Sequence, residues 1–435
     1  MFRKGVKRLI PAQLFRTIEP FGHLLEAMMW NVVEGFPARG LKVIGVTGTD
    51  GKTTTATMIY TLLNDAGMKT GLMTTIGYGV PENWHDNKVH MTTMATRPML
   101  KRIKELRAEG IEWLVLETTS HALAQYRVWG IPYSLAVMTN ITHEHLDYHG
   151  TFERYRDAKR RLFKLAAANV HGLQTGVVNA DDPSAHLFLK DVPREVSYGS
   201  DHGADLTPHN IVSTPAGSTY TVKTDAGELH VKVNLPGTFN VSNSLAAIGV
   251  GLVLGLKAKQ LEHGIAALKT VEGRMNSIDE GQDFGVIVDF AHTPDSFDKI
   301  LSSFRALSTG RLIVVFGSAG RRDEAKRGQQ GASAGKYADL VVVTEEDDRD
   351  ADGQIIMNQI AAGAKTSGKV RGTDLILIAD RTEAINHAIN EAKAGDTVLL
   401  LGKGHEKTIE RADGEHPWDE IGTARAAVRA RLRKK

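Results

Sequence analysis

The feature that most constrains the fold is an alternation of short apolar runs with segments of helical length, which begins at Leu41. Buried parallel strands are typically short, continuous apolar runs, and the helices that connect them are longer. The sequence therefore predicts an α/β fold with a mostly parallel sheet. The strands expected in the first part of the chain are residues 42–46, 113–116, 135–138 and 176–178.

The same alternation begins again after Gly273. Strands are expected here at residues 286–289, 312–316, 340–344, 375–378 and 397–401, and helices at residues 295–306 and 381–394. One stretch departs from this alternation of strands and helices. Residues 218–222 and 228–233 alternate polar and apolar side chains on either side of a turn, which predicts an antiparallel hairpin.

The composition excludes several classes of protein. The chain has no cysteine, which removes disulfides, thiolate catalysis and cysteine-ligated metals and fits a reducing cytosol. A net charge of +2 gives no reason to expect a nucleic-acid partner. No apolar run reaches the roughly 18 residues that a membrane span needs. We expect a cytoplasmic monomer that acts on small molecules.

The N-terminal segment, residues 1–34, is basic at first and then apolar. Two interpretations stay open. It is either an amphipathic helix on an anionic membrane surface or a helix packed on the first domain. We favour the packed helix.

The strongest local motif is a glycine-rich loop between an expected strand and an expected helix. It consists of Gly48, Thr49, Asp50, Gly51, Lys52, Thr53 and Thr54. Such a loop points backbone N–H groups and the positive end of a helix at phosphate oxygens. Lys52 can reach the β- and γ-phosphates, and the Thr53 hydroxyl can ligate Mg²⁺. The sequence therefore predicts an ATP site with bound magnesium.

The length of 435 residues exceeds what one ordinary hydrophobic core holds, so we expect more than one domain. We assign residues 1–40 to an N-terminal helical segment and residues 41–270 to a central P-loop ATPase domain. Residues 271–435 are expected to form a Rossmann-like α/β C-terminal domain, which binds the amino acid.

The loop sequence T-G-T-x-G-K-T-T resembles that of the Mur ligases, and other motifs extend the resemblance over roughly residues 41–425. These motifs lie at residues 116–121, 139–150, 155–159, 235–243, 273–275 and 289–295. The resemblance implies an ATP-dependent, ADP-forming amide ligase. Transfer of the γ-phosphate to a carboxylate gives an acyl phosphate, which an amine then attacks.

The resemblance also implies two Mg²⁺ sites. Thr53 and Glu117 offer hard oxygen ligands for one ion. His145 and a CO₂-derived carbamate on Lys159 would hold the second, because an unmodified lysine is a cation and cannot ligate a metal. Lys52, His145 and Lys159 are the residues expected to be catalytic.

Further nucleotide contacts are implied on both sides of the expected domain boundary. Asn240 and Asn243 correspond to adenine-side residues of the family, although a helix cap would also explain them. Arg274 is expected to contact phosphate or ribose. Asp289 and His292 begin the first loop of the C-terminal domain and are expected to close over the nucleotide.

Within the family, the details resemble the tripeptide-synthetase (MurE) type, which extends UDP-N-acetylmuramoyl-L-Ala-D-Glu in peptidoglycan precursor synthesis. The positions that would hold this muramoyl-peptide acceptor are Thr92, Thr93, Thr119, Gln125 and Arg127. A guanidinium suits carboxylate recognition. Enzymes of this type begin with a UDP-binding domain of on the order of a hundred residues. Only residues 1–40 precede the loop here, so recognition of UDP stays open.

The incoming amino acid is expected to lie against Arg322, Arg349, Gly402 and Glu406. The far end of meso-diaminopimelate carries both an ammonium and a carboxylate, and a cation and an acid on the protein complement these charges. These residues therefore favour meso-diaminopimelate. L-Lysine is the alternative, because residues 346–349 are E-D-D-R where the diaminopimelate-adding type has D-N-P-R. A Mur-like ligase acting on another carboxylate acceptor is a further alternative. A non-catalytic ATP-binding scaffold is disfavoured, because it predicts a damaged metal site.

Overall fold

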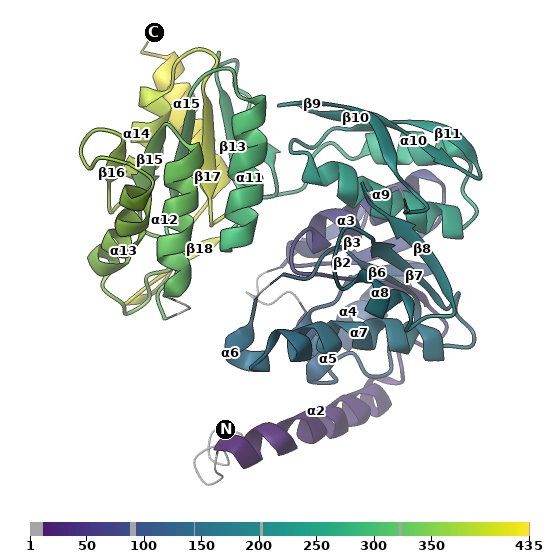
Figure 1. The fold of residues 1–435 in the computed structure, drawn as a ribbon. Coiled ribbons are helices and arrows are strands. Elements are labelled where there is room, and N and C mark those ends of the chain that lie inside the picture. The colour runs from purple at the N-terminus through teal and green to yellow at the C-terminus, as the bar shows by residue number, and fades with distance from the viewer. Residues whose placement is uncertain (1–11, 88–92, 143, 201–202, 322–323, 435) are drawn as a thin grey trace. The chain divides into compact units, whose positions relative to one another are not determined.

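A computed structural model describes residues 12–87, 93–142, 144–200, 203–321 and 324–434 (Figure 1). The chain divides into two compact units. The first comprises Met1–His209, Thr221–Val231 and Ser242–Ala267, and the second comprises Asn210–Tyr220, Lys232–Val241 and Leu268–Lys435. The domain boundaries expected from the sequence stay a prediction.

The first unit is built on an eight-stranded sheet with the order β4-β3-β2-β5-β1-β6-β7-β8. The strands are β1 Lys42–Thr47, β2 Thr70–Met73, β3 Gly77–Val80, β4 Asn83–Asp86, β5 Trp113–Glu117, β6 Tyr133–Met138, β7 Thr175–Asn179 and β8 Arg194–Tyr198. The pairs from β2 to β8 are parallel, whereas β3 and β4 add an antiparallel edge. The four strands predicted for this part of the chain are confirmed.

The helices of the first unit alternate with these strands, as the sequence pattern predicts. They are α2 Ala12–Glu34, α3 Lys52–Asp65, α4 Thr96–Ala108, α5 Ser120–Ala124, α6 Leu146–His149, α7 Phe152–Ala168, α8 Ala185–Leu189 and α10 Ala258–Ala267. Helix α9, Phe239–Val253, begins in the second unit and continues into the first. Leu162 and Phe163 of α7 are fully buried in the core together with Tyr133 and Ala136 of β6.

A separate three-stranded sheet contains the predicted hairpin. Its order is β11-β10-β9, with β9 Pro208–Thr214, β10 Gly217–Thr224 and β11 Gly227–Val233. The sequence pattern predicted the last two strands but not β9.

The second unit is a doubly wound α/β layer. Its six-stranded sheet has the order β12-β13-β17-β14-β15-β16. The strands are β12 Asn276–Ser277, β13 Gly285–Asp289, β14 Leu312–Phe316, β15 Leu340–Val343, β16 Leu375–Leu377 and β17 Thr397–Leu401. The helices are α11 Pro294–Leu307, α12 Ala325–Tyr337, α13 Gly353–Thr366, α14 Arg381–Glu391 and α15 Glu420–Leu432, and a small antiparallel pair comprises β18 Thr408–Arg411 and β19 Gly414–Pro417.

Alternate residues of β14 enter two different cores, as expected for a strand with helices on both faces. Leu312 and Val314 pack with residues of α11, α12 and α13. Ile313 and Val315 pack with residues of α14 and α15. The α/β class predicted from the alternation is therefore confirmed in both units.

Within the described ranges, no helix combines the length and the apolar character needed to cross a membrane.

Candidate active site

The glycine-rich loop joins β1 to α3 at the carboxyl end of the central strand. Gly48 and Gly51 have φ values of 151° and 79°, a region that favours glycine. No side chain caps α3 at Gly51. The first turn of α3 therefore presents backbone N–H groups in the arrangement that binds phosphate. The Lys52 ammonium donates to the Thr49 carbonyl at 2.6 Å and so lies against the same loop.

Residues 139–142, which follow β6, hold this loop by hydrogen bonds. The side chain of Asn140 accepts from the Asp50 N–H at 3.0 Å, and its carbonyl accepts from the Thr49 N–H at 2.7 Å. The Thr139 hydroxyl donates to the Asp50 carbonyl at 2.6 Å. The Thr142 N–H donates to the Thr49 hydroxyl at 2.9 Å. The conformation of the loop is therefore fixed by a segment about ninety residues away.

The last residue of β7 and a residue in the turn after it anchor the holding segment 139–142 in turn. Asn179 donates from its side-chain amide to the Thr139 carbonyl at 2.8 Å. The buried Asp182 carboxylate accepts from the Ile141 N–H at 2.5 Å and from the Ser184 N–H at 2.8 Å. These two side chains therefore support the glycine loop indirectly, through the segment that holds it.

Thr53 and Glu117 meet in the buried region beside the loop. The Thr53 hydroxyl donates to Glu117 Oε2 at 2.9 Å. The same carboxylate oxygen accepts from the backbone N–H and the hydroxyl of Thr75, both at 3.2 Å. A hydroxyl and a carboxylate are hard oxygen donors of the kind that Mg²⁺ prefers, so the chemistry of this pair fits the ion that the sequence predicts.

Lys159 contacts the first glycine of the same loop. Its side chain is buried, its amine donates to the Gly48 carbonyl, and it lies 4.6 Å from the centre of the Tyr155 ring. Burial and the nearby Lys52 charge lower the pKa of Lys159 well below its usual range. Its amine is therefore shifted toward the neutral form, which is the form that can add CO₂.

His145 borders the same aromatic ring but is more exposed than Lys159. Its ring centre lies 6.2 Å from that of Tyr155 and 4.7 Å from that of His121, and its Nε2 lies 3.6 Å from the Glu144 carboxylate. Among the described residues, no three His, Cys, Asp or Glu side chains converge as metal ligands. The second metal site expected at His145 and Lys159 stays a prediction.

Three of the residues predicted to hold the acceptor, Thr93, Thr119 and Arg127, are joined by hydrogen bonds near the end of β5. The Thr93 hydroxyl donates to the Glu117 carbonyl at 3.1 Å and accepts from the Thr119 N–H at 3.0 Å. Arg127 donates from its guanidinium to the Thr93 carbonyl at 3.1 Å. Gln125, two residues before Arg127, is buried, and its Oε1 has no hydrogen-bond partner in the described structure. Thr92 lies outside the described residues.

The two asparagines of α9 have different surroundings. Asn243 is buried, and its Oδ1 accepts from the Thr55 hydroxyl at 3.1 Å. A Cβ atom at Gly51 would lie 2.5 Å from this oxygen, so Asn243 closely contacts the glycine loop. Asn240 is buried and donates to the Pro236 carbonyl at 2.7 Å, four residues before it. This bond is not a helix cap, in which a side-chain oxygen accepts from a backbone N–H, and the role of Asn240 stays a prediction.

In the second unit, Asp289 organises the loop that follows β13. Its carboxylate accepts from the Met275 N–H at 2.8 Å and from the Ala291 N–H at 2.7 Å. Burial raises the pKa of Asp289, while the Arg274 charge and these two hydrogen bonds oppose the shift. The hydrogen bonds of Asp289 thus hold the segment around Arg274 to the start of the next loop.

An aromatic cluster surrounds the same loop. The Arg274 guanidinium lies 4.6 Å from the Phe290 ring centre, and His292 Nδ1 lies 3.0 Å from the Phe290 carbonyl. His405 packs on the ring of Phe290 at 5.0 Å. Burial and the Arg274 charge lower the pKa of His405 to about 3, so it is neutral at physiological pH. The structure therefore places the predicted residues Arg274, Asp289 and His292 together.

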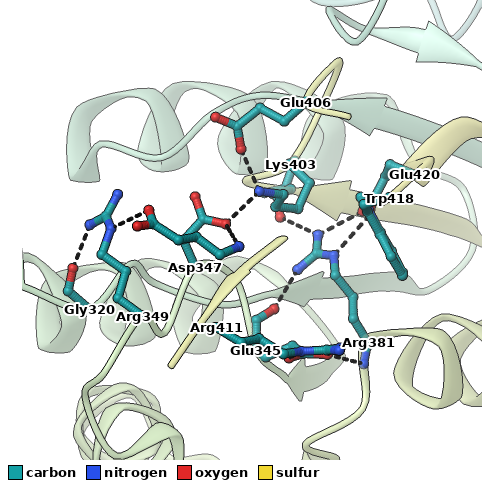
Figure 2. A network of polar contacts seen from close by, with 12 residues as sticks. Gly320, Glu345, Asp347, Arg349, Arg381, Lys403, Glu406, Arg411, Trp418 and Glu420 are labelled. Carbon is teal, nitrogen blue, oxygen red and sulfur yellow. Dashed lines mark hydrogen bonds and ion pairs between the residues drawn. The ribbon is translucent and has the colours of Figure 1, made fainter. Parts of the chain in front are cut away.

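Two of the residues predicted to bind the amino acid, Arg349 and Glu406, belong to a charged network in the second unit (Figure 2). Buried Lys403 donates to Asp347 at 2.8 Å and to Glu406 at 2.6 Å. Burial alone would lower the pKa of Lys403, but the charges of Glu406 and Asp347 raise it. The backbone of Gly402 also approaches this network, because a Cβ atom there would lie 2.9 Å from Glu346 Oε2.

Arg349 completes this arrangement with a partner that the sequence did not suggest. Its guanidinium donates to Glu410 at 2.7 Å and to the Gly320 carbonyl at 2.7 Å. Burial and the neighbouring acids Glu345, Glu346 and Asp347 raise the pKa of Asp348 to about 6. The predicted residue Arg322 lies outside the described residues.

Sequence reasoning missed two residues that support these groups, Thr75 and Lys403. Thr75 carries no motif, because it lies in the turn between β2 and β3 and reaches Glu117 only through the fold. Lys403 lies within residues 402–406, which read G-K-G-H-E and contain the predicted residues Gly402 and Glu406. A lysine directly between Gly402 and Gly404, after a buried strand, is the signal that could have marked it as buried.

Two protein families match the chain. The Mur ligase middle domain matches residues 46–251. The Mur ligase, glutamate ligase domain, matches residues 273–404. The chain therefore belongs to the Mur ligase family, whose members are ATP-dependent ligases, and the resemblance seen in its motifs is confirmed.

Relatives within this family are similar over most of their length. A UDP-N-acetylmuramyl-tripeptide synthetase of Roseiflexus sp. (strain RS-1) is 41% identical over 91% of this chain and 80% of that protein. A UDP-N-acetylmuramoyl-L-alanyl-D-glutamate–2,6-diaminopimelate ligase of Geobacillus thermodenitrificans is 37% identical over 95% of this chain and 84% of that protein. A solved structure of a ligase of that second name has a TM-score of 0.66 at 30% identity, over 95% of this chain and 83% of the other.

The contact between Gly51 and Asn243 gives a first prediction. Gly51→Ala is compared with Gly67→Ala, since both glycines have nearly the same positive φ, 79° and 81°. An alanine costs on the order of 1–2 kcal/mol in this conformation at either site. Only at Gly51 does the new Cβ also meet Asn243, whereas nothing lies within 4 Å at Gly67.

We expect both variants to lower the free energy of unfolding in denaturant titrations, Gly51→Ala by at least as much as Gly67→Ala. Gly51→Ala should also weaken ATP binding, measured by calorimetry, by about tenfold or more, which corresponds to about 1.4 kcal/mol. Equal ATP affinities for the two variants would contradict the placement of the nucleotide at this loop.

Proposed function

We propose that this chain joins a diamino acid to UDP-N-acetylmuramoyl-L-Ala-D-Glu in peptidoglycan precursor synthesis, with cleavage of ATP to ADP and phosphate. We propose meso-diaminopimelate as the amino acid. The observation that carries the proposal is the arrangement around one glycine loop. The uncapped start of α3, the Thr53–Glu117 pair and buried Lys159 all contact or adjoin this loop.

The names of the relatives support the substrate class. Two of them, from Roseiflexus and Deinococcus radiodurans, are 41% identical to this chain and are named tripeptide synthetases. The Geobacillus thermodenitrificans relative is named a 2,6-diaminopimelate ligase. These names favour a muramoyl-dipeptide acceptor and a diamino acid.

The chain's own groups suit each step of acyl-phosphate formation. The N–H groups of α3 and the Lys52 ammonium bind and orient the phosphates. An acceptor carboxylate oxygen attacks the γ-phosphorus, the bond to the β–γ bridging oxygen breaks, and ADP leaves. The amine of the diamino acid then attacks the acyl carbon, phosphate leaves, and the amine loses a proton. Mg²⁺ held by Thr53 and Glu117 would neutralise phosphate charge.

Thr93, Thr119, Gln125 and Arg127 are proposed to hold the acceptor. Hydrogen bonds tie Thr93 to the carbonyl of Glu117, and Thr119 and Arg127 to Thr93. An acceptor bound there would lie next to the strand end that carries the Glu117 carboxylate. The unpartnered Oε1 of Gln125 is suited to accept a hydrogen bond from a peptide N–H of the acceptor.

The carbamate on Lys159 is proposed from the burial of this side chain. The neutral amine adds to CO₂ and loses a proton, which converts a buried base into an anion. An uncompensated ammonium in such a position is costly, whereas a carbamate with a metal ion is neutralised. With His145, the carbamate would supply the second Mg²⁺ site.

One observation favours L-lysine as a second candidate for the amino acid. Arg349, the cation expected to bind a far carboxylate, already donates to Glu410. Asp347 and Asp348 add further acid next to it. Such an environment suits an amino acid whose far end carries only an ammonium. We place the reaction in the cytoplasm and expect a monomer.

The direct test of this function is a substrate panel. The protein is incubated with ATP, Mg²⁺, UDP-N-acetylmuramoyl-L-Ala-D-Glu and either meso-diaminopimelate or L-lysine. We expect tripeptide and equimolar ADP by mass spectrometry and coupled assay, with meso-diaminopimelate as the better substrate. If ADP release depends instead on a different carboxylate acceptor, the proposed acceptor is wrong while the proposed ligase reaction stands. Absence of acceptor-dependent ADP release with every substrate would contradict the function itself.

The carbamate has its own test in Lys159→Ala and Lys159→Arg. Both variants should retain ATP binding and lose at least about a thousandfold in turnover, because neither can form the anion, and loss of a group that stabilises transition-state charge has this magnitude. Carbon-13 NMR of the wild-type protein in labelled bicarbonate should show a carbamate resonance that is absent from Lys159→Arg. Full activity of Lys159→Arg would exclude the carbamate.

A further inference from the structure

Helix α2 is attached to the first unit by one of its faces. Ala27 and Asn31 are fully buried. The Asn31 side-chain amide donates to the Trp129 carbonyl at 2.9 Å. The guanidinium of Arg97 lies 4.1 Å from the centre of the Trp30 ring. These contacts fix the rotation of α2 about its own axis, so the direction of its other face is defined as well (Figure 1).

The other face of α2 is apolar and exposed. Phe21, Leu25 and Val32 are 63%, 68% and 67% exposed, and Met28 lies between them at 40%. This spacing of four, three and four residues places the side chains in one row along the helix. A second row alongside contains Met29 and Val33, at 49% and 61% exposure. A continuous apolar patch of this length marks an interaction surface.

The sequence before this patch is strongly basic. The first eighteen residues contain Arg3, Lys4, Lys7, Arg8 and Arg16, and Glu19 is the first acidic residue of the chain. Positive charge beside an amphipathic helix is typical of binding to anionic lipid, because headgroups attract the charges while the apolar row enters the acyl boundary. An anionic bilayer satisfies both features, whereas a second copy of the chain would match only the apolar row.

The helix is suited to lie in the plane of such a surface and not to cross it. Glu26 and Glu34 interrupt its apolar sequence, and no helix in the described parts of the chain is apolar enough to span a bilayer. Because the opposite face is occupied by contacts with the first unit, binding through the exposed row would leave that unit intact beside the membrane.

We propose that α2 attaches this protein to the surface of an anionic lipid bilayer through the row Phe21, Leu25, Met28 and Val32. The basic residues that precede this row in the sequence favour an anionic surface over a neutral one. This proposal does not depend on the function proposed for the glycine-loop site. It implies that the first unit is held at a membrane whose inner leaflet carries negative charge.

The test is co-sedimentation with vesicles of phosphatidylcholine alone or with phosphatidylglycerol added in a third of the lipid. Wild-type protein should bind the mixed vesicles at least about tenfold more tightly than the neutral ones, since each basic residue near the surface contributes on the order of a tenfold factor or less. Raising the salt should weaken this binding. The double variant Leu25→Glu, Val32→Glu should lose it.

The matched control is Leu165→Glu, Val170→Glu, which changes two exposed apolar residues of the same unit that lie outside α2. This variant should bind vesicles as the wild type does. A second variant, Leu25→Trp, keeps the apolar row and should give an emission shift to shorter wavelength with the mixed vesicles. This readout holds even if the double glutamate variant folds poorly.

Equal vesicle binding by wild type and the double glutamate variant would overturn the proposal, as would no binding to mixed vesicles and no shift for Leu25→Trp. Light scattering, which measures the oligomeric state, distinguishes the remaining outcome, a dimer formed through this face. If wild type is a dimer without lipid, and the double glutamate variant is a monomer while neither binds vesicles, then a second copy covers this face and the membrane proposal is wrong.

Discussion

The arrangement of the first unit depends on the parallel pairing of β1 with both β5 and β6. In this pairing Val46 lies opposite Glu117, and Thr47 lies opposite Met138. The carboxyl ends of three strands therefore meet at one edge, which is where open α/β sheets bind ligands. The glycine loop, the Glu117 carboxylate and the holding segment 139–142 each follow one of these strands. A slip of one residue in either pairing would separate them.

Burial then determines the chemistry that these groups can perform. Thr53 and Glu117 share a hydrogen bond away from water, where electrostatic interactions are strong. Lys159 is brought against the loop by α7, whose apolar residues pack in the core beside β6. Burial disfavours the ammonium form of Lys159. Conversion of this lysine to a carbamate would replace that form with an anion that can ligate a metal ion. The second unit also buries a lysine, Lys403, but here the ammonium is stabilised by ion pairs with Asp347 and Glu406.

Much of the fold could be predicted from the sequence because buried strands such as residues 312–316 are continuous apolar runs. The loop and its partner Glu117 were also predictable, because both belong to motifs. Thr75 was not, because its contact with Glu117 exists only after β2 has paired with β5. The pairing of Arg349 with Glu410 was equally hidden, since it requires β18 to lie beside the segment after β15. For residues 1–34 the sequence left a packed helix and a membrane-surface helix open, because both have an apolar face. Only the structure shows which apolar residues of α2 are exposed.

The central claim is that the groups around the glycine loop activate a carboxylate as its acyl phosphate. The most direct measurement uses an acceptor whose reacting carboxylate is labelled with oxygen-18, together with ATP, Mg²⁺ and the diamino acid. Mass spectrometry of the released phosphate should then find one heavy oxygen transferred from the acceptor for each amide formed. Unlabelled phosphate, released while the amide still forms, would contradict the account.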